Sequence, residues 1–452
     1  MPGVSVSSEG RVPGSRAQSC GLGDQMHDLA RDLYPIPRSL TGNGVRETLS
    51  RLRTLLPDLK CHEVPSGSKA FDWTVPNEWN VREAYVVTPD GRRILDFAES
   101  NLHLLGYSTP VDAEMPLAVL QDHLYSDAEQ PDAIPYVTSY YEERWGFCLK
   151  HSDRIALKEG TYRVVIDATL EPGSLTFGDL VIRGESEEEV LLSTYVCHPS
   201  LANNELSGPV VATYLARWVA EKPRRYTYRF VFVPETIGSI VYLSQNLDHL
   251  KRHVVAGFNL TCIGDDRSYS YLPTRDGDTL SDRVALHTLG HLHPDFVRYS
   301  YLDRGSDERQ YNSPGVDLPV ALVIRTKFGA YPEYHTSLDD LSLVTPDGLF
   351  GGYDAVRHCL LCLEQNLSVK ATVLCEPQMG KRGLYNTLSR KGGHETRKRM
   401  MDVLAYADGR DVLDLAETLG CPAWELEEPI DTLRAAGLLE VSGANSERGI
   451  QA

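Results

Sequence analysis

The sequence predicts an α/β protein built on a doubly wound, mainly parallel sheet. In its second half, apolar runs of strand length alternate with helical segments, as in strand–helix–strand units. The first of these runs, 190–196, ends just before His198 and Pro199, and a polar loop then leads into an apolar helical segment at 209–220. Pro199 ends strand pairing because it has no N–H to donate. The pattern therefore places a histidine at the carboxyl end of a strand, where open α/β sheets bind their ligands.

The remaining elements follow from hydrophobic periodicity and from turn residues. Further strands are predicted at 60–64, 162–170, 175–183, 226–233, 254–263 and 320–325. Helices are predicted at 22–33, 43–56, 280–292 and 350–366. The helix at 43–56 is closed by Pro57, which cannot continue it.

Changes in composition divide the chain into four parts. Residues 1–21 contain many Ser, Gly, Val and Arg without the apolar core of a signal peptide, which predicts a disordered tail. Residues 22–78 and 160–370 form a large, discontinuous α/β domain. Residues 79–159 form an inserted β-rich domain, in which the turn at 89–91 separates two strand-like runs and short strands follow.

The fourth part, residues 371–452, resembles a winged-helix module. Three short helical patterns, at 395–406, 412–419 and 423–436, precede a final β-element. From residue 375 onward, 10 Lys and Arg stand against 13 Asp and Glu, and this slight excess of negative charge argues against DNA binding. The alternative is a structural or dimerising appendage, and a dimerising one would make the chain a homo-oligomer.

The overall composition excludes several classes of protein. The 452 residues carry a formal charge of −18, which argues against nucleic-acid and anionic-membrane partners. No apolar run approaches the roughly 18 to 20 residues of a membrane span. Nine scattered cysteines, an odd number, indicate reduced thiols in a cytoplasmic protein. Cys359 and Cys362 lie in an apolar helical stretch, so we expect them in the core and not at a zinc or redox site.

Several predicted strands are followed by side chains that can bind a metal ion. Glu235 follows the apolar run 226–233, and an acidic side chain at that position needs a partner such as a metal ion. Imidazole and carboxylate ligands with one open position for water are typical of catalytic zinc. The candidates at this edge of the predicted sheet are His198, Glu235, Asp265, Asp307 and His335.

Four motifs resemble the zinc aminopeptidase-like proteins of the M28 type. They are CHPSLANNELSG at 197–208, PETIGS at 234–239, GSDERQY at 305–311 and YHTSLDD at 334–340. With SYYEERWGFC at 139–148 and NLTCIGDD at 259–266, they are more similar to a bacterial subfamily often found beside polysaccharide-biosynthesis genes. The resemblance covers roughly residues 25–440 and implies an aminopeptidase-like domain, an inserted small β-domain and a C-terminal winged helix.

The resemblance also implies roles for individual residues. It makes His198 the first metal ligand and His335 the last. It places Glu235 in the position of the family's acidic pair, as the general base or alternatively as a ligand. It puts Asp307 near the substrate or behind a ligand histidine, which such a carboxylate commonly orients.

Two positions depart from the family pattern. Asn204 occupies the place of a metal-bridging aspartate, and an amide oxygen is a much weaker ligand than a carboxylate. Thr261 stands where a two-metal aminopeptidase has another aspartate. We therefore expect one zinc ion, with Asn204 as a weak ligand and Glu205 or Asp265 as compensating ones. Loss of tight metal binding is the alternative.

These observations predict a zinc-dependent amide or peptide hydrolase of the aminopeptidase type. Glu235 would remove a proton from water and return it to the leaving amine. The substrate would be a small peptide, or an N-acyl or aminoacyl group on a sugar or secondary metabolite. Candidate substrate contacts are Arg309, Tyr311 and Trp145.

Two competing functions are compatible with the same residues. One is a metal-poor protein of the same fold that binds a ligand or scaffolds an assembly without turnover, which Asn204 favours. The other is a ligand-sensing regulator that binds DNA, which the acidic C-terminal module argues against.

Overall fold

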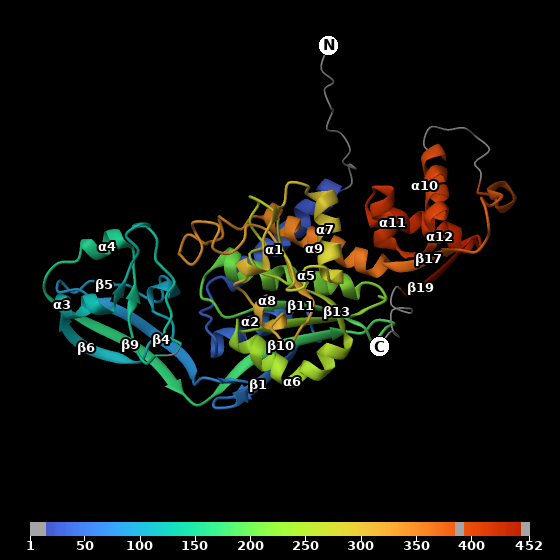
Figure 1. Ribbon diagram of the computed structural model, residues 1–452. Coiled ribbons are helices and arrows are strands. Elements are labelled where there is room, and N and C mark those ends of the chain that lie inside the picture. Colours follow the sequence, from blue (N-terminus) through green and yellow to red (C-terminus); the bar gives the residue numbers. More distant parts are fainter. Residues whose placement is uncertain (1–14, 141, 385–392, 444–452) are drawn as a thin grey trace, which may run out of the picture.

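The computed structural model describes residues 15–140, 142–384 and 393–443. Figure 1 shows three parts side by side: a β-rich lobe, a central sheet covered by helices, and a C-terminal group of helices with a small sheet. The long strands β4 (Glu78–Val87) and β9 (Thr161–Glu171) lead from the lobe toward the central part. Within the described ranges, no helix combines the length and the apolar character needed to cross a bilayer.

The central sheet has eight strands, and the inner four run parallel. Their spatial order is β1 (Lys60–Pro65), β10 (Ser174–Ile182), β12 (Thr227–Val233), β11 (Glu189–Tyr195), β13 (Val254–Asn259), β16 (Val320–Ile324), β14 (Ser270–Leu272) and β15 (Val297–Arg298). Strands β10 and β14 flank the parallel block and pair antiparallel with it. This sheet between layers of helices confirms the predicted fold class.

Side-chain alternation along β11 explains why helices cover both faces of the sheet. Val190 and Leu192 belong to one buried cluster, and Leu191 and Tyr195 belong to another, because successive side chains of a strand point to opposite faces. The first cluster includes residues of α1 (Ser15–Leu33), α2 (Asn43–Arg53), α5 (Ser207–Ala220), α7 (Leu280–Leu292) and α9 (Pro346–Gln365). The second includes residues of α6 (Ile237–His253).

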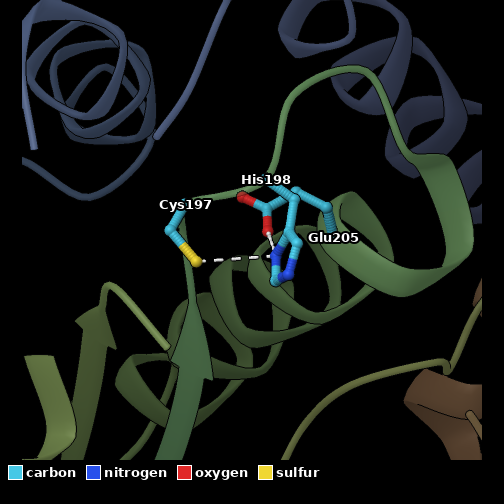
Figure 2. A group of neighbouring side chains, drawn as sticks. All are labelled: Cys197, His198 and Glu205. Atoms are coloured by element: carbon cyan, nitrogen blue, oxygen red, sulfur yellow. Dashed lines mark hydrogen bonds and ion pairs between the residues drawn. The ribbon is translucent and has the colours of Figure 1, made fainter. Parts of the chain in front are cut away.

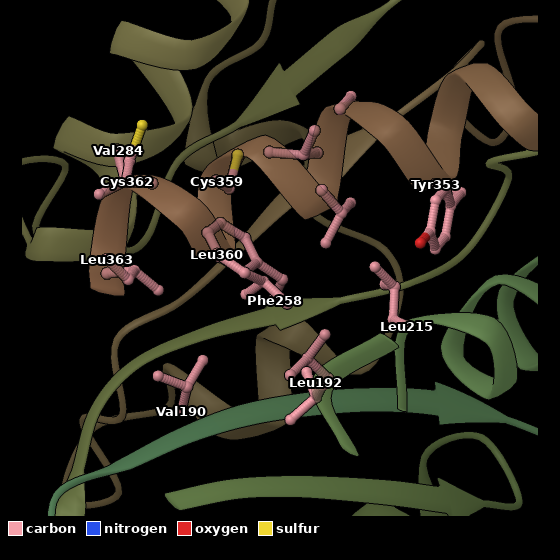
Figure 3. Packing of buried hydrophobic residues seen from close by; sticks show 14 of the residues in the cluster. Val190, Leu192, Leu215, Phe258, Val284, Tyr353, Cys359, Leu360, Cys362 and Leu363 are labelled. Carbon is pink, nitrogen blue, oxygen red and sulfur yellow. The ribbon is translucent and has the colours of Figure 1, made fainter. Parts of the chain in front are cut away.

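Helix α9 shows how tightly this core is packed. In Figure 3 its apolar side chains extend toward the strands, and Leu360 lies beside Phe258 of β13. Cys359 and Cys362 are fully buried free thiols in the same cluster. Burial raises the pKa of the Cys362 thiol to about 12, so it stays neutral. The expectation that these two cysteines are core residues is confirmed.

The β-rich lobe contains a four-stranded sheet in the order β5 (Arg93–Ile94), β4, β9 and β6 (Val111–Pro116). The predicted large domain included β9, but the structure pairs this strand with β4 and β6 along its length. Its sequence pattern shows an apolar strand without showing which sheet receives it. The shorter elements nearby are α3 (Leu117–Leu120), α4 (His151–Ile155), the pair β2 (Lys69–Ala70) and β3 (Trp73–Thr74), and the pair β7 (Leu124–Tyr125) and β8 (Phe147–Cys148).

The first helix begins earlier than predicted. Helix α1 starts at Ser15, although composition predicts a disordered tail as far as residue 21. Its buried residues Met26, Ala30 and Leu33 recur at helical spacing and pack on the first face of the sheet. Residues 1–14 of the predicted tail lie outside the described part of the chain.

The C-terminal part combines three helices with a three-stranded sheet. Its elements are β17 (Leu367–Ala371), α10 (Gly393–Tyr406), β18 (Asp408–Asp411), α11 (Val412–Leu419), α12 (Glu427–Ala435) and β19 (Leu439–Gly443), with sheet order β18-β17-β19. Arg283 of α7 forms ion pairs with Asp411 at 2.9 Å and Asp414 at 2.8 Å, so this part is fastened to the central one.

Candidate active site

Three of the predicted site residues meet beyond the carboxyl ends of the parallel strands. His198 follows β11, Glu235 follows β12, and His335 lies in the loop after β16. The rings of His198 and His335 have centroids 5.7 Å apart. Nε2 of His198 lies 3.5 Å from Oε2 of Glu235. The structure therefore brings the two histidines and the glutamate together, as the strand-end argument requires.

Glu205, which lies in the turn before α5, contacts the Nδ1 side of the His198 ring (Figure 2). Nδ1 of His198 lies 2.9 Å from Oε2 of Glu205, which leaves Nε2 facing Glu235. Burial alone would lower the pKa of His198, but Cys197 and Glu205 together raise it well above its usual value. A carboxylate behind a ligand histidine fixes the orientation of the ring and increases its basicity.

The buried side chain of Glu205 is stabilised by an ion pair with Arg38. Both side chains are fully buried, and Nε of Arg38 lies 3.2 Å from Oε1 of Glu205. The guanidinium also donates to the carbonyl oxygens of His198 at 3.0 Å and Leu33 at 2.7 Å. Reasoning from sequence missed Arg38, because the polar turn at 202–206 does not reveal that Glu205 is fully buried and needs a cation close by.

His335 supplies a buried nitrogen that has no partner within the described residues. Its ring stacks on Tyr334 with centroids 3.9 Å apart, and its backbone has a φ of 58°, in the left-handed region. Nε2 of His335 is buried and makes no hydrogen bond. Burial and the charge of His198 lower the pKa of His335 to about 3, so its imidazole is neutral. A neutral, unpaired imidazole nitrogen beside a second histidine fits a metal ligand.

Glu235 sits on a turn that Asp307 holds in place. Oδ1 of Asp307 accepts hydrogen bonds from the N–H of Thr236 at 2.7 Å and from the hydroxyl of Ser239 at 2.9 Å. Thr236 has a φ of 64°, which is unusual for a β-branched residue. Asp307 therefore stabilises the strained turn that carries Glu235, while the carboxylate behind a histidine is Glu205.

The pKa values of Glu235 and Asp307 are both higher than usual, so both carboxyl groups are protonated more readily. Burial raises the pKa of Glu235, although the charges of His198 and Arg309 act against this rise. Burial and the neighbouring Glu235 raise the pKa of Asp307 to about 7. A carboxylate with a raised pKa in a cleft is a typical general base.

Asn204 and Thr261 form a neutral patch where a second metal ion would need carboxylates. Oδ1 of Asn204 accepts a hydrogen bond from the Tyr195 hydroxyl at 2.9 Å, and this hydroxyl lies 2.5 Å from Oγ1 of Thr261. Asp265 does not compensate, because its oxygens bind Asn203 and Thr326 within the fold. Among the described residues, this patch therefore offers no free carboxylate to a second metal ion.

The tightest group of metal-binding atoms in the described residues is not the predicted one. Ligand atoms of Cys197, His198 and Glu205 all lie within 4.8 Å of one another. A cation there would face the Arg38 guanidinium, and burial raises the pKa of Cys197 to about 11, so its thiol is protonated. The set of His198, Glu235 and His335 is more open, and among the described residues no arginine forms an ion pair with Glu235, so it suits an ion better.

The β-rich lobe closes one side of the site. The ring of Tyr136 stands edge-on to His198, with centroids 5.3 Å apart, and its hydroxyl pairs with that of Tyr140 at 2.7 Å. Ile134 and Ser337 exchange two hydrogen bonds, at 3.0 and 2.8 Å, which tie this segment to the His335 loop. The density of aromatic residues at 134–148 was the only signal for this wall in the sequence.

The three substrate contacts predicted from the sequence lie in different parts of the structure. Tyr311 is fully buried and binds the Ser193 hydroxyl at 2.7 Å, so it belongs to the core. Trp145 stacks on His123 within the lobe, with ring centroids 3.6 Å apart. Arg309 lies at the site, where its Nη2 donates to Thr236 at 2.7 Å.

The fold defines an aminopeptidase-like protein with a C-terminal winged helix. Residues 27–366 match the family described as a domain of unknown function, DUF4910, and residues 367–441 match a winged helix-turn-helix family. The chain belongs to the DUF4910 family, with the winged-helix domain joined directly after it.

A full-length relative comes from Clostridium acetobutylicum. It is named for an aminopeptidase-like domain and a provisional role in polysaccharide biosynthesis, and it is 42% identical over 428 residues, covering 94% of this chain and 98% of its own. A crystal structure of a provisionally named peptidase from the same organism has a TM-score of 0.89 at 41% identity, with 94% and 98% of the two chains covered.

More distant structures share the fold of the central part. A zinc aminopeptidase from Bacillus subtilis has a TM-score of 0.54 at 16% identity, covering 78% of this chain and 95% of its own. An M28 peptidase precursor from Shewanella amazonensis has a TM-score of 0.52 at 13% identity, covering 80% and 99%. The predicted resemblance to M28 aminopeptidase-like proteins is confirmed.

Proposed function

We propose that this protein is an amide hydrolase of the aminopeptidase type that uses a single zinc ion. Its substrate would be a small peptide, or an N-acyl or aminoacyl group on a sugar or secondary metabolite. The observation that carries the proposal is the unpaired, buried Nε2 of His335 beside His198 and Glu235. A buried polar atom without a partner costs free energy, and a metal ion would remove that cost.

Each residue of the site has a separate role in the proposed hydrolysis. His198 and His335 would hold the zinc ion, which would supply Lewis-acid polarisation of the scissile carbonyl. Glu235 takes a proton from the attacking water and returns it to the leaving amine, a task favoured by its raised pKa. Glu205 orients His198, and Asp307 keeps the Glu235 turn in place. Tyr136 limits the access of bulk water to the two histidines.

A second candidate, a binding protein without turnover, is favoured by the neutral pair Asn204 and Thr261. Both proposals are tested by metal analysis and by amine release from an amide library. We expect about one zinc ion per chain, lost in His335→Ala and kept in His62→Ala, an exposed histidine far from the site. Undetectable zinc together with no released amine would support the binding protein.

The variant Glu235→Gln separates the two roles proposed for that residue. A general base can be neutralised without loss of the ion, so we expect zinc to stay bound while kcat falls about 10² to 10⁴-fold. If zinc is lost together with activity, Glu235 is a ligand and another group must be the base.

We further propose that the winged-helix part binds no nucleic acid. The charged side chains that line a groove of about 930 Å³ between α10 and α12 are mainly acidic. These are Asp402, Glu425, Glu427, Glu428 and Asp431, against Lys398 and Arg399. Phosphate backbones are repelled by such a surface. Retardation of duplex DNA at low salt would contradict this proposal, and sedimentation of the chain would test whether the part serves dimerisation.

A further inference from the structure

Arg309 lies at the site and forms no ion pair with a carboxylate of the described residues. It lies in the short helix α8 (Glu308–Tyr311), and its Nη2 donates to the Thr236 hydroxyl, one residue after Glu235. Its Nε is buried and makes no hydrogen bond with any described residue. Leaving a buried guanidinium donor unpaired is costly, which indicates that the partner is a bound molecule.

The acids around Arg309 each use one carboxylate oxygen for other contacts, and none of them forms an ion pair with Arg309. Asp307 binds the Thr236 N–H and the Ser239 hydroxyl through Oδ1. Oε1 of Glu308 accepts from the backbone N–H groups of Gly305 and Ser306. Glu235 is directed at Nε2 of His198. In the described part of the chain, no ion pair within 4.0 Å therefore neutralises Arg309, unlike the buried Arg38 and Arg229, which pair with Glu205 and Glu189.

The guanidinium is also close to the reacting groups. Burial raises the pKa of Glu235 and of Asp307, and the charge of Arg309 counteracts the rise at both. It acts in the same direction on Tyr334, whose ring stacks on His335. Through its hydrogen bond to Thr236, the residue after Glu235, the guanidinium lies beside the turn that carries the proposed base.

We propose that Arg309 binds a carboxylate group of the substrate, close to the amide bond that is cleaved. A guanidinium has five N–H donors in a planar fork that matches a carboxylate, and only one of its nitrogens is used by Thr236. The substrate class is thus an amide with a free carboxylate, such as a dipeptide or an N-acyl amino acid. This inference rests on the proposed hydrolase function and narrows it.

The test compares dipeptides and N-acetyl amino acids with their C-terminal carboxamides in the wild-type protein, in Arg309→Gln and in Arg304→Gln. Arg304 is an exposed arginine whose guanidinium lies 5.0 Å from the centroid of the Tyr301 ring, so it is a matched control. We expect the wild type and Arg304→Gln to prefer the acids in kcat/KM by about 10 to 100-fold, the range of a hydrogen-bonded charge. In Arg309→Gln the preference disappears, because kcat/KM falls more for the acids than for the carboxamides.

The ratio of acid to carboxamide distinguishes recognition from a structural role, because a distorted site would impair both substrates. Equal cleavage of both in the wild type, or a preference that survives in Arg309→Gln, overturns the inference and leaves the hydrolase proposal intact. If no amine is released at all, calorimetric binding of the same acids and carboxamides decides the inference separately. Stronger binding of inorganic phosphate than of acetate would assign Arg309 to a phosphoryl group and overturn the carboxylate.

Discussion

Tyr136 and His335 come from distant parts of the chain and are joined twice. The N–H of Tyr136 donates to the carbonyl oxygen of His335 at 2.8 Å, and the two rings meet edge-on with centroids 5.2 Å apart. The lobe thereby contributes a side chain to the site and also holds the backbone of a proposed ligand.

Removing the ring of Tyr136 should impair catalysis more than folding. In Tyr136→Ala the two imidazoles lose their cover and the His335 loop loses packing, so we expect kcat/KM to fall about 10²-fold, as for small misplacements of a catalytic group. Tyr136→Phe, which loses only the hydroxyl contact with Tyr140, should keep most activity. Steady-state kinetics of both variants, with Tyr85→Ala elsewhere in the lobe as the control, checks this expectation.

Glu205 should prove important both for stability and for zinc. Glu205→Gln leaves the buried Arg38 without its counter-charge, which typically costs about 3 to 5 kcal/mol. It also weakens the support of His198, and zinc affinity should fall about 10 to 100-fold. Glu189→Gln breaks the similarly buried pair with Arg229 far from the site and should lower stability alone. Equal zinc affinity in the two variants would contradict the role of Glu205.

Restoring the missing carboxylate should strengthen metal binding. In Asn204→Asp the Tyr195 hydroxyl can still donate to an oxygen, and the buried, unpaired Nδ2 of Asn204 is removed. We expect zinc to bind about tenfold more tightly or better, a gain of about 1.4 kcal/mol. Calorimetric titration with zinc measures the change, and Asn204→Ala, which adds no charge, should show no gain.

The junction with the winged helix should make stability depend on pH. Nε2 of His287 accepts the N–H of Ala423 at 2.9 Å, which requires that nitrogen to be unprotonated. Burial, followed by the charges of His291 and Arg283, lowers the pKa of His287 from 6.5 to about 4. The unfolded chain takes up this proton near pH 6.5 and the folded chain only near pH 4. Stability should therefore fall by about 3 kcal/mol as the pH drops through this window.

Denaturant unfolding between pH 4 and pH 8 measures this contribution. His287→Gln keeps an acceptor that does not titrate, so its stability should change less with pH than that of the wild type. An identical pH dependence in the two proteins would mean that His287 does not contribute.

The residues that follow the strands were predicted from the sequence, whereas the side chains that hold them in place, such as Arg38, were not. His198 and Glu235 were found because an apolar strand that ends in a polar side chain has a period and a boundary that can be recognised. Arg38 could not be placed, because nothing local connects its loop to the turn of Glu205. Strand β9 was included in the predicted large domain although it pairs with β4 and β6 of the lobe, since an alternating pattern does not reveal the hydrogen-bonding partner.

The role of Asp307 shows a further limit. Asp307 was predicted near the substrate or behind a ligand histidine, which stays a prediction; in the structure its Oδ1 supports the turn of Glu235 through Thr236 and Ser239. The positive φ of Thr236 that makes this support necessary is a backbone property that the residue type does not reveal.

The buried pair of Arg38 and Glu205 also bears on the order in which the protein is made. Both residues, and the strand that carries His198, leave the ribosome long before His335 is synthesised. The part of the site that contains His198 and Glu205 can therefore fold around Arg38 during translation. His335 then only has to pack against a surface that has already formed. Ribosome-bound chains that stop before residue 335 would already protect Glu205 from solvent while remaining unable to bind an ion.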